Sequence, residues 1–196
     1  MREVTLFIAM SLDGYIADEN GGVDWLEGDG TAGPVLDPYP DFIRNIDTIL
    51  IGWNTYHQIV SELSPDYWVY EEQETIVFTH REQSSSNKIR FTKEDPVTYL
   101  KELKKTKGKG IWICGGASLI SQLRNADLID CYDITIIPVL LGSGIRLFEQ
   151  RNQTEKLRLE KVQHGQGMMN LVYTRRNEAG RSELPKKQET AGCKSS

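Results

Sequence analysis

Cysteine is scarce in this sequence, and its cysteines have neither the number nor the spacing of a disulfide framework or a structural zinc site. Cys114, Cys131 and Cys193 are odd in number and form no C-x-x-C pair. Long apolar runs are also missing. None approaches the roughly 18 residues that cross a bilayer, and no basic and apolar leader opens the chain. We therefore expect a cytoplasmic protein of a reducing compartment that does not bind a membrane.

Positive charge is scarce in the part of the chain that carries most of its apolar residues. Residues 1–174 contain 17 Lys and Arg against 25 Asp and Glu, whereas residues 175–196 contain six against three. A body with this acidic excess repels the phosphate backbone of nucleic acids. We therefore expect no nucleic-acid partner.

Motifs of hydrolytic and nucleotide-hydrolysing enzymes are missing as well. His80-Arg81-Glu82 matches the H-x-E of zinc deaminases, but their P-C-x-x-C partner is absent. The sequence contains neither a G-x-S-x-G nucleophile elbow nor a Walker A loop. Cys114 lies inside an apolar run and is interpreted as an inert core thiol. We expect no metal site, and the pattern favours an enzyme whose organic cofactor performs the difficult step.

Two stretches of the chain join a buried strand to a helix through glycine. The apolar run 111–114 is followed by Gly115 and Gly116, and helical spacing of apolar residues begins near 117–118. The run 48–51 likewise ends at Gly52 before a second helix start. A glycine bend allows close approach to the main chain, and the free N–H groups of a helix start suit a phosphate. The alternative interpretation is a tight turn without a ligand.

Strand and helix patterns alternate along the chain. This alternation predicts an α/β fold with a mostly parallel central sheet, helices on both faces and a C-terminal antiparallel hairpin around 165–167. Residues 1–175 form the expected domain, and the polar tail 176–196 is expected to be disordered. The expected strands are 4–10, 48–51, 75–79, 89–91, 111–114, 131–138, 157–164 and 170–174, and the expected helices begin near 41, 54, 95 and 117.

A long polar segment, 18–40, separates the first strand from the first helix. Loops of this length inside a domain are usually lids or binding segments, and Trp25 is its expected anchor. Acidic residues cluster around this segment, and most are interpreted as solvated residues or helix caps. Asp41 is the expected cap of the helix that follows. The acids are Asp13, Asp24, Asp29, Asp37 and Asp41, of which Asp13, Asp29 and Asp41 are the candidate proton donors.

Four motifs resemble, in the same order, those of a known enzyme family. The family is the reductase domain at the C-terminal end of the bifunctional riboflavin-biosynthesis deaminase-reductase, within the dihydrofolate reductase-like superfamily. The resemblance covers residues 3–175. The motifs are Ser11-Leu12-Asp13-Gly14-Tyr15-Ile16-Ala17, Gly52-x-x-Thr55-Tyr56, Ile113-Cys114-Gly115-Gly116-Ala117 and Ile137-Pro138-Val139-Leu140-Leu141-Gly142-Ser143-Gly144-Ile145-Arg146-Leu147-Phe148.

The resemblance implies a three-layer αβα fold, NADPH as hydride donor, a small heterocyclic substrate and a homodimer. By position in the motifs, Ala9 and Ile16 would flank the nicotinamide, and Trp25 would lie over the active-site cleft. The implied diphosphate contacts are Gly52, Thr55, Gly115, Gly116, Ala117 and Ser118. The implied contacts near the adenosine 2′-phosphate are Thr79, His80 and Arg81.

One residue departs from the family pattern. Many members carry Arg after the glycine that Gly52 matches, and this chain has Trp53. The change removes a charge-assisted contact worth roughly 1.5–3 kcal/mol, so a preference for NADPH would depend on Arg81 and Lys88. The leading hypothesis is a reductase resembling 5-amino-6-(5-phosphoribosylamino)uracil reductase. A dihydrofolate reductase-type pterin reductase and a non-catalytic dinucleotide-binding protein are the alternatives.

Overall fold

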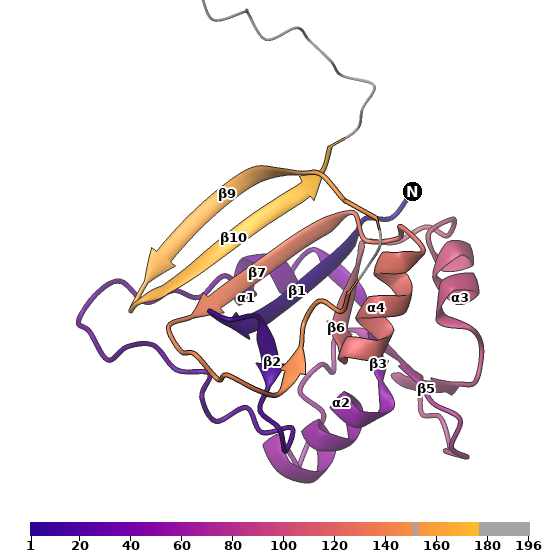
Figure 1. Ribbon diagram of the computed structural model, residues 1–196. Coiled ribbons are helices and arrows are strands. Elements are labelled where there is room, and N and C mark those ends of the chain that lie inside the picture. The colour runs from indigo at the N-terminus through magenta and orange to yellow at the C-terminus, as the bar shows by residue number, and fades with distance from the viewer. Residues whose placement is uncertain (151–152, 177–196) are drawn as a thin grey trace, which may run out of the picture.

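The fold is built on one eight-stranded sheet with the order β5-β4-β3-β6-β1-β7-β10-β9 (Figure 1). The computed structural model describes residues 1–150 and 153–176. Neighbouring strands are parallel from β5 to β7, and β10 and β9 add two antiparallel pairings at one edge. The predicted mostly parallel sheet is therefore confirmed. The strands are β1 (Val4–Ser11), β3 (Ile46–Gly52), β4 (Glu74–Phe78), β5 (Ile89–Thr92), β6 (Gly110–Gly115), β7 (Cys131–Ile137), β9 (Leu157–Gly165) and β10 (Met168–Arg175).

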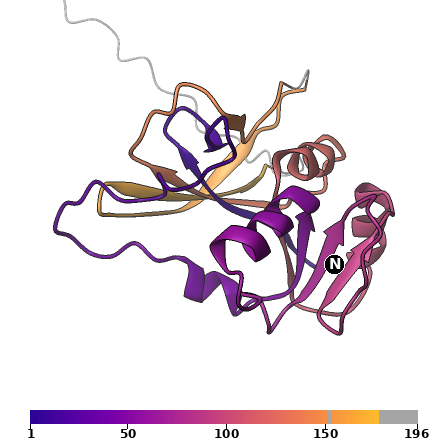
Figure 2. The same ribbon diagram turned by 90° about the horizontal axis from the view of Figure 1, so that it is seen from below.

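Helices cover both faces of this sheet, so the three-layer αβα arrangement that the resemblance implies is confirmed. On one face lie α3 (Pro96–Leu103) and α4 (Ala117–Asn125), and on the other lie α1 (Tyr39–Ile43) and α2 (Trp53–Gln58). A π-helical turn, η1 (Ile59–Leu63), continues α2. Figure 2 shows α1 and α4 on opposite sides of the sheet.

The alternation of side chains along β6 explains why both faces need cover. Successive residues of a strand point to opposite faces. Ile111 and Ile113 belong to the core cluster that includes residues of α3 and α4, whereas Trp112 packs on the α1 side with Ile46 and Ile49. All five residues are buried. A strand that is apolar on both faces is stable only between two layers of helices.

The C-terminal hairpin is formed by β9 and β10, as the sequence predicts. Its connection is Gln166 and Gly167, which have φ values of 51° and 74°. Two-residue turns with positive φ match the right-handed twist of paired strands. Thr174 and Arg175 still pair with β9 at the end of β10. The predicted disorder of the tail concerns residues from 177 onward, which lie outside the described residues.

Two helix starts show where cap prediction succeeds and fails. The Asp95 side chain accepts a hydrogen bond from the Thr98 amide at 2.8 Å, so the start of α3 is confirmed. The prediction for Asp41 is wrong, because α1 begins at Tyr39 with Pro38 as its cap residue. A second proline lies in the first turn of α1, where its fixed φ and missing N–H favour a helix start. Asp41 lies inside that turn.

The described residues contain no helix that is both long enough and apolar enough to cross a bilayer.

Asp13 ties the first strand to a distant loop. Its carboxylate accepts hydrogen bonds from the Ser11 hydroxyl at 2.6 Å, the Gly142 amide at 2.7 Å and the Leu141 amide at 3.2 Å. These bonds, with that from Ser11 the strongest, lower the pKa of Asp13 from 3.8 to about 2. They hold the small sheet of β2 (Tyr15–Ala17) and β8 (Ile145–Arg146) against the end of β1.

We predict that Asp13→Asn lowers the melting temperature at pH 7. Because the folded-state pKa is depressed, the stabilisation is present above about pH 4 and is lost as the pH falls from about 4 toward 2. The difference between wild type and variant, measured by differential scanning calorimetry from pH 7 to pH 3, should therefore shrink below pH 4. The exposed Asp24 gives the control Asp24→Asn, which should change little. A constant difference at every pH would contradict this role for the Asp13 charge.

Candidate functional site

The two glycine turns of the sequence meet at one edge of the sheet. They follow β3 and β6, which are adjacent and parallel, so both strands end at the same edge. A Cβ added to Gly52 would lie 3.5 Å from the amide nitrogen of Gly116. A Cβ added to Gly116 would lie only 3.0 Å from Oγ1 of Thr55. The turns therefore lie side by side and form a single site.

The start of α4 forms the centre of this site. Its N-cap residue is Gly116, and no side chain caps its first turn. Gly115 has a φ of 136°, which side-chain-bearing residues rarely adopt, and the Gly115–Gly116 peptide is cis. The first N–H groups of a helix lack intrahelical partners and carry partial positive charge. An uncapped helix start behind a glycine turn fits the diphosphate of a dinucleotide, with Ala117 and the exposed Ser118 in its first turn.

The end of β4 adds a cation next to this centre. The guanidinium carbon of Arg81 lies 4.9 Å from the centroid of the Trp53 ring, and Trp53 is the first residue of α2. Thr79 orders the turn, since its Oγ1 accepts from the Arg81 amide at 3.1 Å. His80 is exposed beside them. The structure therefore brings Arg81 to Trp53, the residue that departs from the pattern that the resemblance implies.

This pairing was missed in the sequence because 28 positions separate the two residues. The register of β3 and β4 places Gly52 beside Phe78, so the residues that follow the two strands must meet. That register cannot be read from either strand alone. The sequence alone therefore indicated only that Trp53 lacks a positive charge. In the structure, the Trp53 ring packs against the guanidinium of Arg81, which follows β4.

Ala9 and Ile16 lie near the same edge of the sheet. Ala9 is half-buried near the end of β1, which lies beside β6. Ile16 belongs to β2 and packs against the main core. The strand order thus places Ala9 one strand away from the glycine turns.

Aromatic side chains fill the space between α1 and the sheet next to Ala9. Phe7 stacks on Phe42 of α1, with ring centroids 4.2 Å apart, and Trp112 meets both rings edge-on. Tyr70 lies against Trp112 at 5.0 Å. This cluster was not recognised in the sequence, because its members come from four separate segments. Burial raises the pKa of the neighbouring Cys114 thiol to about 12, which agrees with the interpretation of an inert thiol.

The residues proposed for the lid and for proton transfer lie on loops and on a helix surface. The Trp25 indole donates to the carbonyl of Gly22 in its own loop at 3.1 Å. The hydroxyl and amide of Thr31 lower the pKa of the exposed Asp29. Asp41 is exposed and forms an ion pair with Arg44.

The carboxylates thus have structural partners of their own. Hydrogen bonds lower the pKa values of Asp13 and Asp29, away from the neutral range in which a general acid works best. The general-acid roles of these residues stay a prediction. Within residues 1–150 and 153–176, no group of three or more His, Cys, Asp or Glu side chains is arranged to hold a metal ion.

Comparison with known proteins agrees with this geometry. The family model described as the RibD C-terminal domain matches residues 2–171. The uncharacterized protein YwjB of Bacillus subtilis (strain 168) is 39% identical over 178 residues, covering 89% of this chain and 98% of that protein. The riboflavin biosynthesis protein RibD of Corynebacterium ammoniagenes is 28% identical over 158 residues, covering 72% of this chain and 44% of that protein.

A solved structure shows the same fold. The crystal structure of a putative riboflavin biosynthesis protein from Shewanella sp. PV-4 superimposes with a TM-score of 0.75 and 28% identity, covering 90% of this chain and all of that one. The family model spans β1 to β9, the first half of β10, both glycine turns and the Arg81 segment described above. The chain belongs to the family of the RibD C-terminal domain, the reductase domain of riboflavin-biosynthesis proteins.

Proposed function

We propose that this protein is an NADPH-dependent reductase of a small heterocyclic substrate. The observation that carries the proposal is the convergence of Gly52, Gly116 and Thr55 at the uncapped start of α4. A side chain at either glycine would occupy the space in front of the helix amides. The family match over residues 2–171 supports the same cofactor class.

The residues of the site would share the binding of the dinucleotide. The amides of the first turn of α4 and the Thr55 hydroxyl would hold the diphosphate, because they supply hydrogen-bond donors without a competing carboxylate. Ala9 and Ile16 would position the nicotinamide. When bound, NADPH supplies the hydride. Water would return the proton, since Asp13 and Asp29 are held ionised.

The preference for NADPH would depend on Arg81. A 2′-phosphate is the chemical difference between NADPH and NADH, and a guanidinium binds phosphate by charge-assisted hydrogen bonds. Packing on the Trp53 ring reduces the freedom of the Arg81 side chain before the cofactor arrives. Trp53 would therefore compensate in part for the charge that its own position lacks.

The proposed substrate class follows the relatives, two of which are named for riboflavin biosynthesis. A compound resembling 5-amino-6-(5-phosphoribosylamino)uracil is the leading candidate. Pterin reduction is the second candidate. It is disfavoured because a pterin site would need a carboxylate in a fixed position, whereas Asp29 lies exposed on a loop. The third candidate is a non-catalytic dinucleotide-binding protein. It would bind NADPH but would not oxidise it with either the pyrimidine or the pterin substrate. We propose a cytoplasmic location for the enzyme.

We predict that Arg81→Ala weakens NADPH binding by about tenfold or more and leaves NADH binding within about twofold, because only NADPH carries the 2′-phosphate. Titration followed by nicotinamide fluorescence measures both dissociation constants. Arg90→Ala, which removes an exposed arginine of the neighbouring β5, is the matched control. Saturable binding of neither nucleotide to the wild type would reject the proposed function. Equal weakening of both nucleotides would reject the role of Arg81.

We predict that Gly116→Val weakens NADPH and NADH binding alike, by about tenfold or more, with a much smaller effect on melting temperature. The new side chain would meet Oγ1 of Thr55 and cover the helix amides that the diphosphate needs. Gly33→Val, in an exposed loop where an added Cβ meets nothing closer than 3.9 Å, is the control. A loss of stability that matches the loss of binding would assign Gly116 to packing alone.

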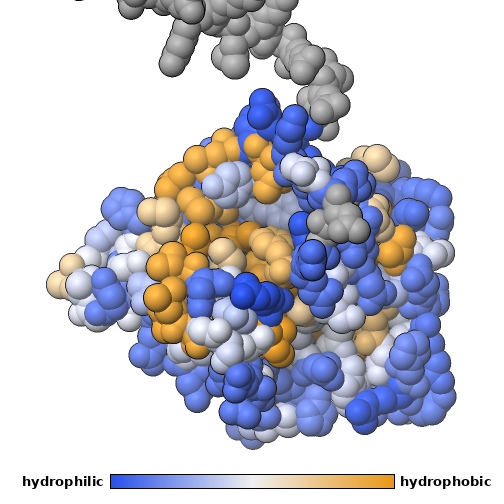
Figure 3. Space-filling model, viewed as in Figure 1, coloured by the Kyte–Doolittle hydropathy of each residue, from blue (hydrophilic) through white to orange (hydrophobic). Residues whose placement is uncertain are grey.

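We also propose that the protein forms a homodimer through an apolar face of the sheet. Figure 3 shows hydrophobic side chains gathered over β7, β9 and β10 on the side that carries α4. Leu159, Val162 and Met169 are 49%, 47% and 43% exposed there. Apolar patches of this kind usually mark an interface. A second copy is the proposed occupant, because the same exposed apolar residues are present on both copies, so a two-fold axis would bring one patch against the other beside the edge strand β9.

We predict that Val162→Asp converts this dimer to a monomer in size-exclusion chromatography with light scattering. A carboxylate buried without a partner at an apolar interface should weaken association by about 100-fold or more. Arg158→Glu is the control, because Arg158 points to the opposite face of the same strand, so the dimer should persist. A wild-type protein that remains monomeric at tens of micromolar concentration would contradict the proposed interface.

A further inference from the structure

The segment that follows β2 folds back on itself as one hydrogen-bonded unit. The Asp18 carboxylate accepts hydrogen bonds from the amides of Asn20 and Gly22, both at 2.8 Å, and the Asp18 amide donates to the Gly22 carbonyl at 3.0 Å. The Gly22 carbonyl also accepts the indole N–H of Trp25 at 3.1 Å. Because these bonds tie residues 18–25 together, holding this unit at one point also sets the direction of the Trp25 ring.

Helix α2 holds this unit by a side chain. The side-chain amide of Gln58, the last residue of α2, donates to the Gly21 carbonyl at 2.8 Å. The same amide nitrogen lies 3.4 Å from Oε2 of Glu62. The entry to the unit is fixed differently, since a Cβ added to Gly144 would lie 2.2 Å from the Ala17 carbonyl oxygen. Main-chain packing therefore fixes the entry, and a hydrogen bond from α2 fixes the turn.

Gln58 shares a helix face with a residue of the candidate site. Thr55 and Gln58 are three residues apart in α2, and residues at this spacing are neighbours on a helix surface. A Cβ added to Gly116 would lie 3.0 Å from Oγ1 of Thr55, so this face of α2 reaches the glycine turns. One helix of six residues therefore contacts both the glycine turns and the unit that carries Trp25.

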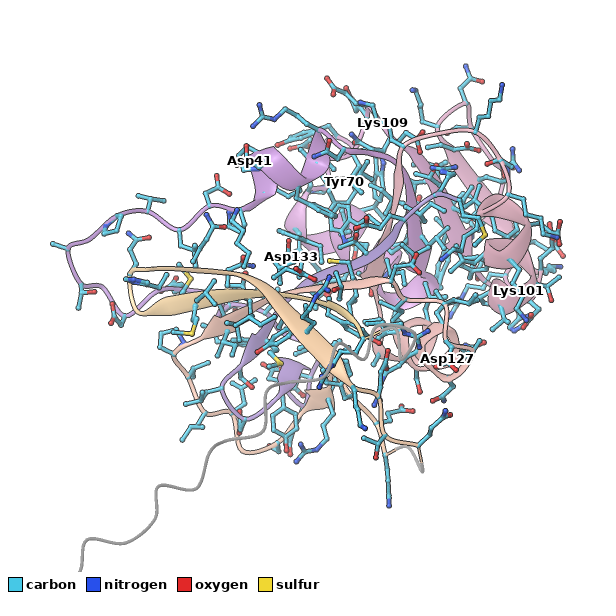
Figure 4. All side chains as sticks on the ribbon, turned by 90° about the horizontal axis from the view of Figure 1, so that it is seen from above. Asp41, Tyr70, Lys101, Lys109, Asp127 and Asp133 are labelled. Carbon is cyan, nitrogen blue, oxygen red and sulfur yellow. The ribbon has the colours of Figure 1, made fainter. Side chains whose placement is uncertain are left out.

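The next part of the long segment is held by a different element. The Asp29 amide donates to the Gln166 carbonyl at the tip of the β9–β10 hairpin, at 3.0 Å. Figure 4 shows the segment leaving the hairpin tip for α1, the helix that carries Asp41. This second attachment does not involve α2. Loss of the Gln58 bond should therefore release residues 18–25 and leave the part beside the hairpin in place.

We propose that Gln58 is a positioning residue that holds residues 18–25 so that Trp25 covers the nicotinamide of a bound dinucleotide. The inference rests on the proposed function, which places Ile16, two residues before this unit, at the nicotinamide. Contact of the dinucleotide with Thr55 orders α2, and the Gln58 hydrogen bond extends that order to the unit. The covering tryptophan then excludes water from the place of hydride transfer.

Hydrogen–deuterium exchange of the full chain, with and without saturating NADPH, tests this role. In the wild type, NADPH should slow the exchange of residues 18–25. Gln58→Glu keeps the size of the side chain but replaces the N–H donor with a carboxylate that faces the Gly21 carbonyl. Without NADPH, residues 18–25 of this variant should exchange about tenfold or more faster than in the wild type, and NADPH should protect them much less. Residues 28–36 and the melting temperature should change little.

Two further variants separate the hydrogen bond from its surroundings. Gln58→Lys restores an N–H donor at the same position and should exchange like the wild type. Glu62→Gln makes the reverse exchange of acid and amide one turn away, keeps the Gln58 donor, and should also exchange like the wild type. Fast exchange of residues 18–25 in Gln58→Lys would overturn the role of the donor. Faster exchange throughout the sheet in Gln58→Glu would assign Gln58 to folding alone.

The indole N–H of Trp25 reports the cover itself. Its resonance in ¹H–¹⁵N spectra is identified by its absence from the Trp25→Phe variant. It should shift when NADPH is added to the wild type and shift much less in Gln58→Glu. The dissociation constant of NADPH, measured by nicotinamide fluorescence, should stay close to that of the wild type, because Gln58 contacts the unit and not the dinucleotide.

The outcomes distinguish this inference from the proposed function. NADPH binding without protection of residues 18–25 in the wild type would overturn the inference and leave the proposed function intact. Equal exchange in the wild type and Gln58→Glu, or a Trp25 indole resonance that NADPH does not move, would do the same. A wild type without saturable NADPH binding would overturn both.

Discussion

The close approach of two main-chain turns constrains the architecture of this protein. Where β3 and β6 end, an added Cβ at Gly52 would lie 3.5 Å from the Gly116 nitrogen, and one at Gly116 would lie 3.0 Å from the Thr55 hydroxyl. Parallel pairing of β3 and β6 brings the turns together, and burial on both faces keeps those strands adjacent. At this edge of the sheet α4 begins, and no side chain makes a capping hydrogen bond to its first turn.

The surroundings of this centre include a cation beside the start of α2. The Trp53 ring packs against Arg81 from the end of β4. The charge is supplied by the neighbouring strand and stays close to the start of α2.

Much of the fold could be predicted from local sequence patterns. The run of Ile111 to Cys114 is apolar on both faces, the cap at Asp95 precedes a proline, and the hairpin turn carries glycine, so each signal lies within a few residues. The start of α1 was misplaced because Pro38 and Pro40 outweighed the capping preference of Asp41. The glycine turns were found for the same local reason.

Features of the site that depend on long-range pairing could not be predicted. Arg81 meets Trp53 through the register of β3 and β4, and Asp133 meets Asn170 through the antiparallel pairing of β7 and β10. In each case the two residues lie on segments that show no motif of their own, and they become neighbours only through the register of two paired strands. A sequence gives the turn chemistry of each strand end, whereas the strand order decides which ends become neighbours.

The central claim is that main-chain amides at the glycine turns bind the diphosphate of a dinucleotide. Backbone amide chemical shifts of ¹⁵N-labelled protein, recorded during titration with NADPH, test it most directly. The account predicts that the amides of Gly52, Gly116 and Ala117 shift most and saturate together. Changes confined to other regions, or a spectrum that NADPH leaves unchanged, would contradict it.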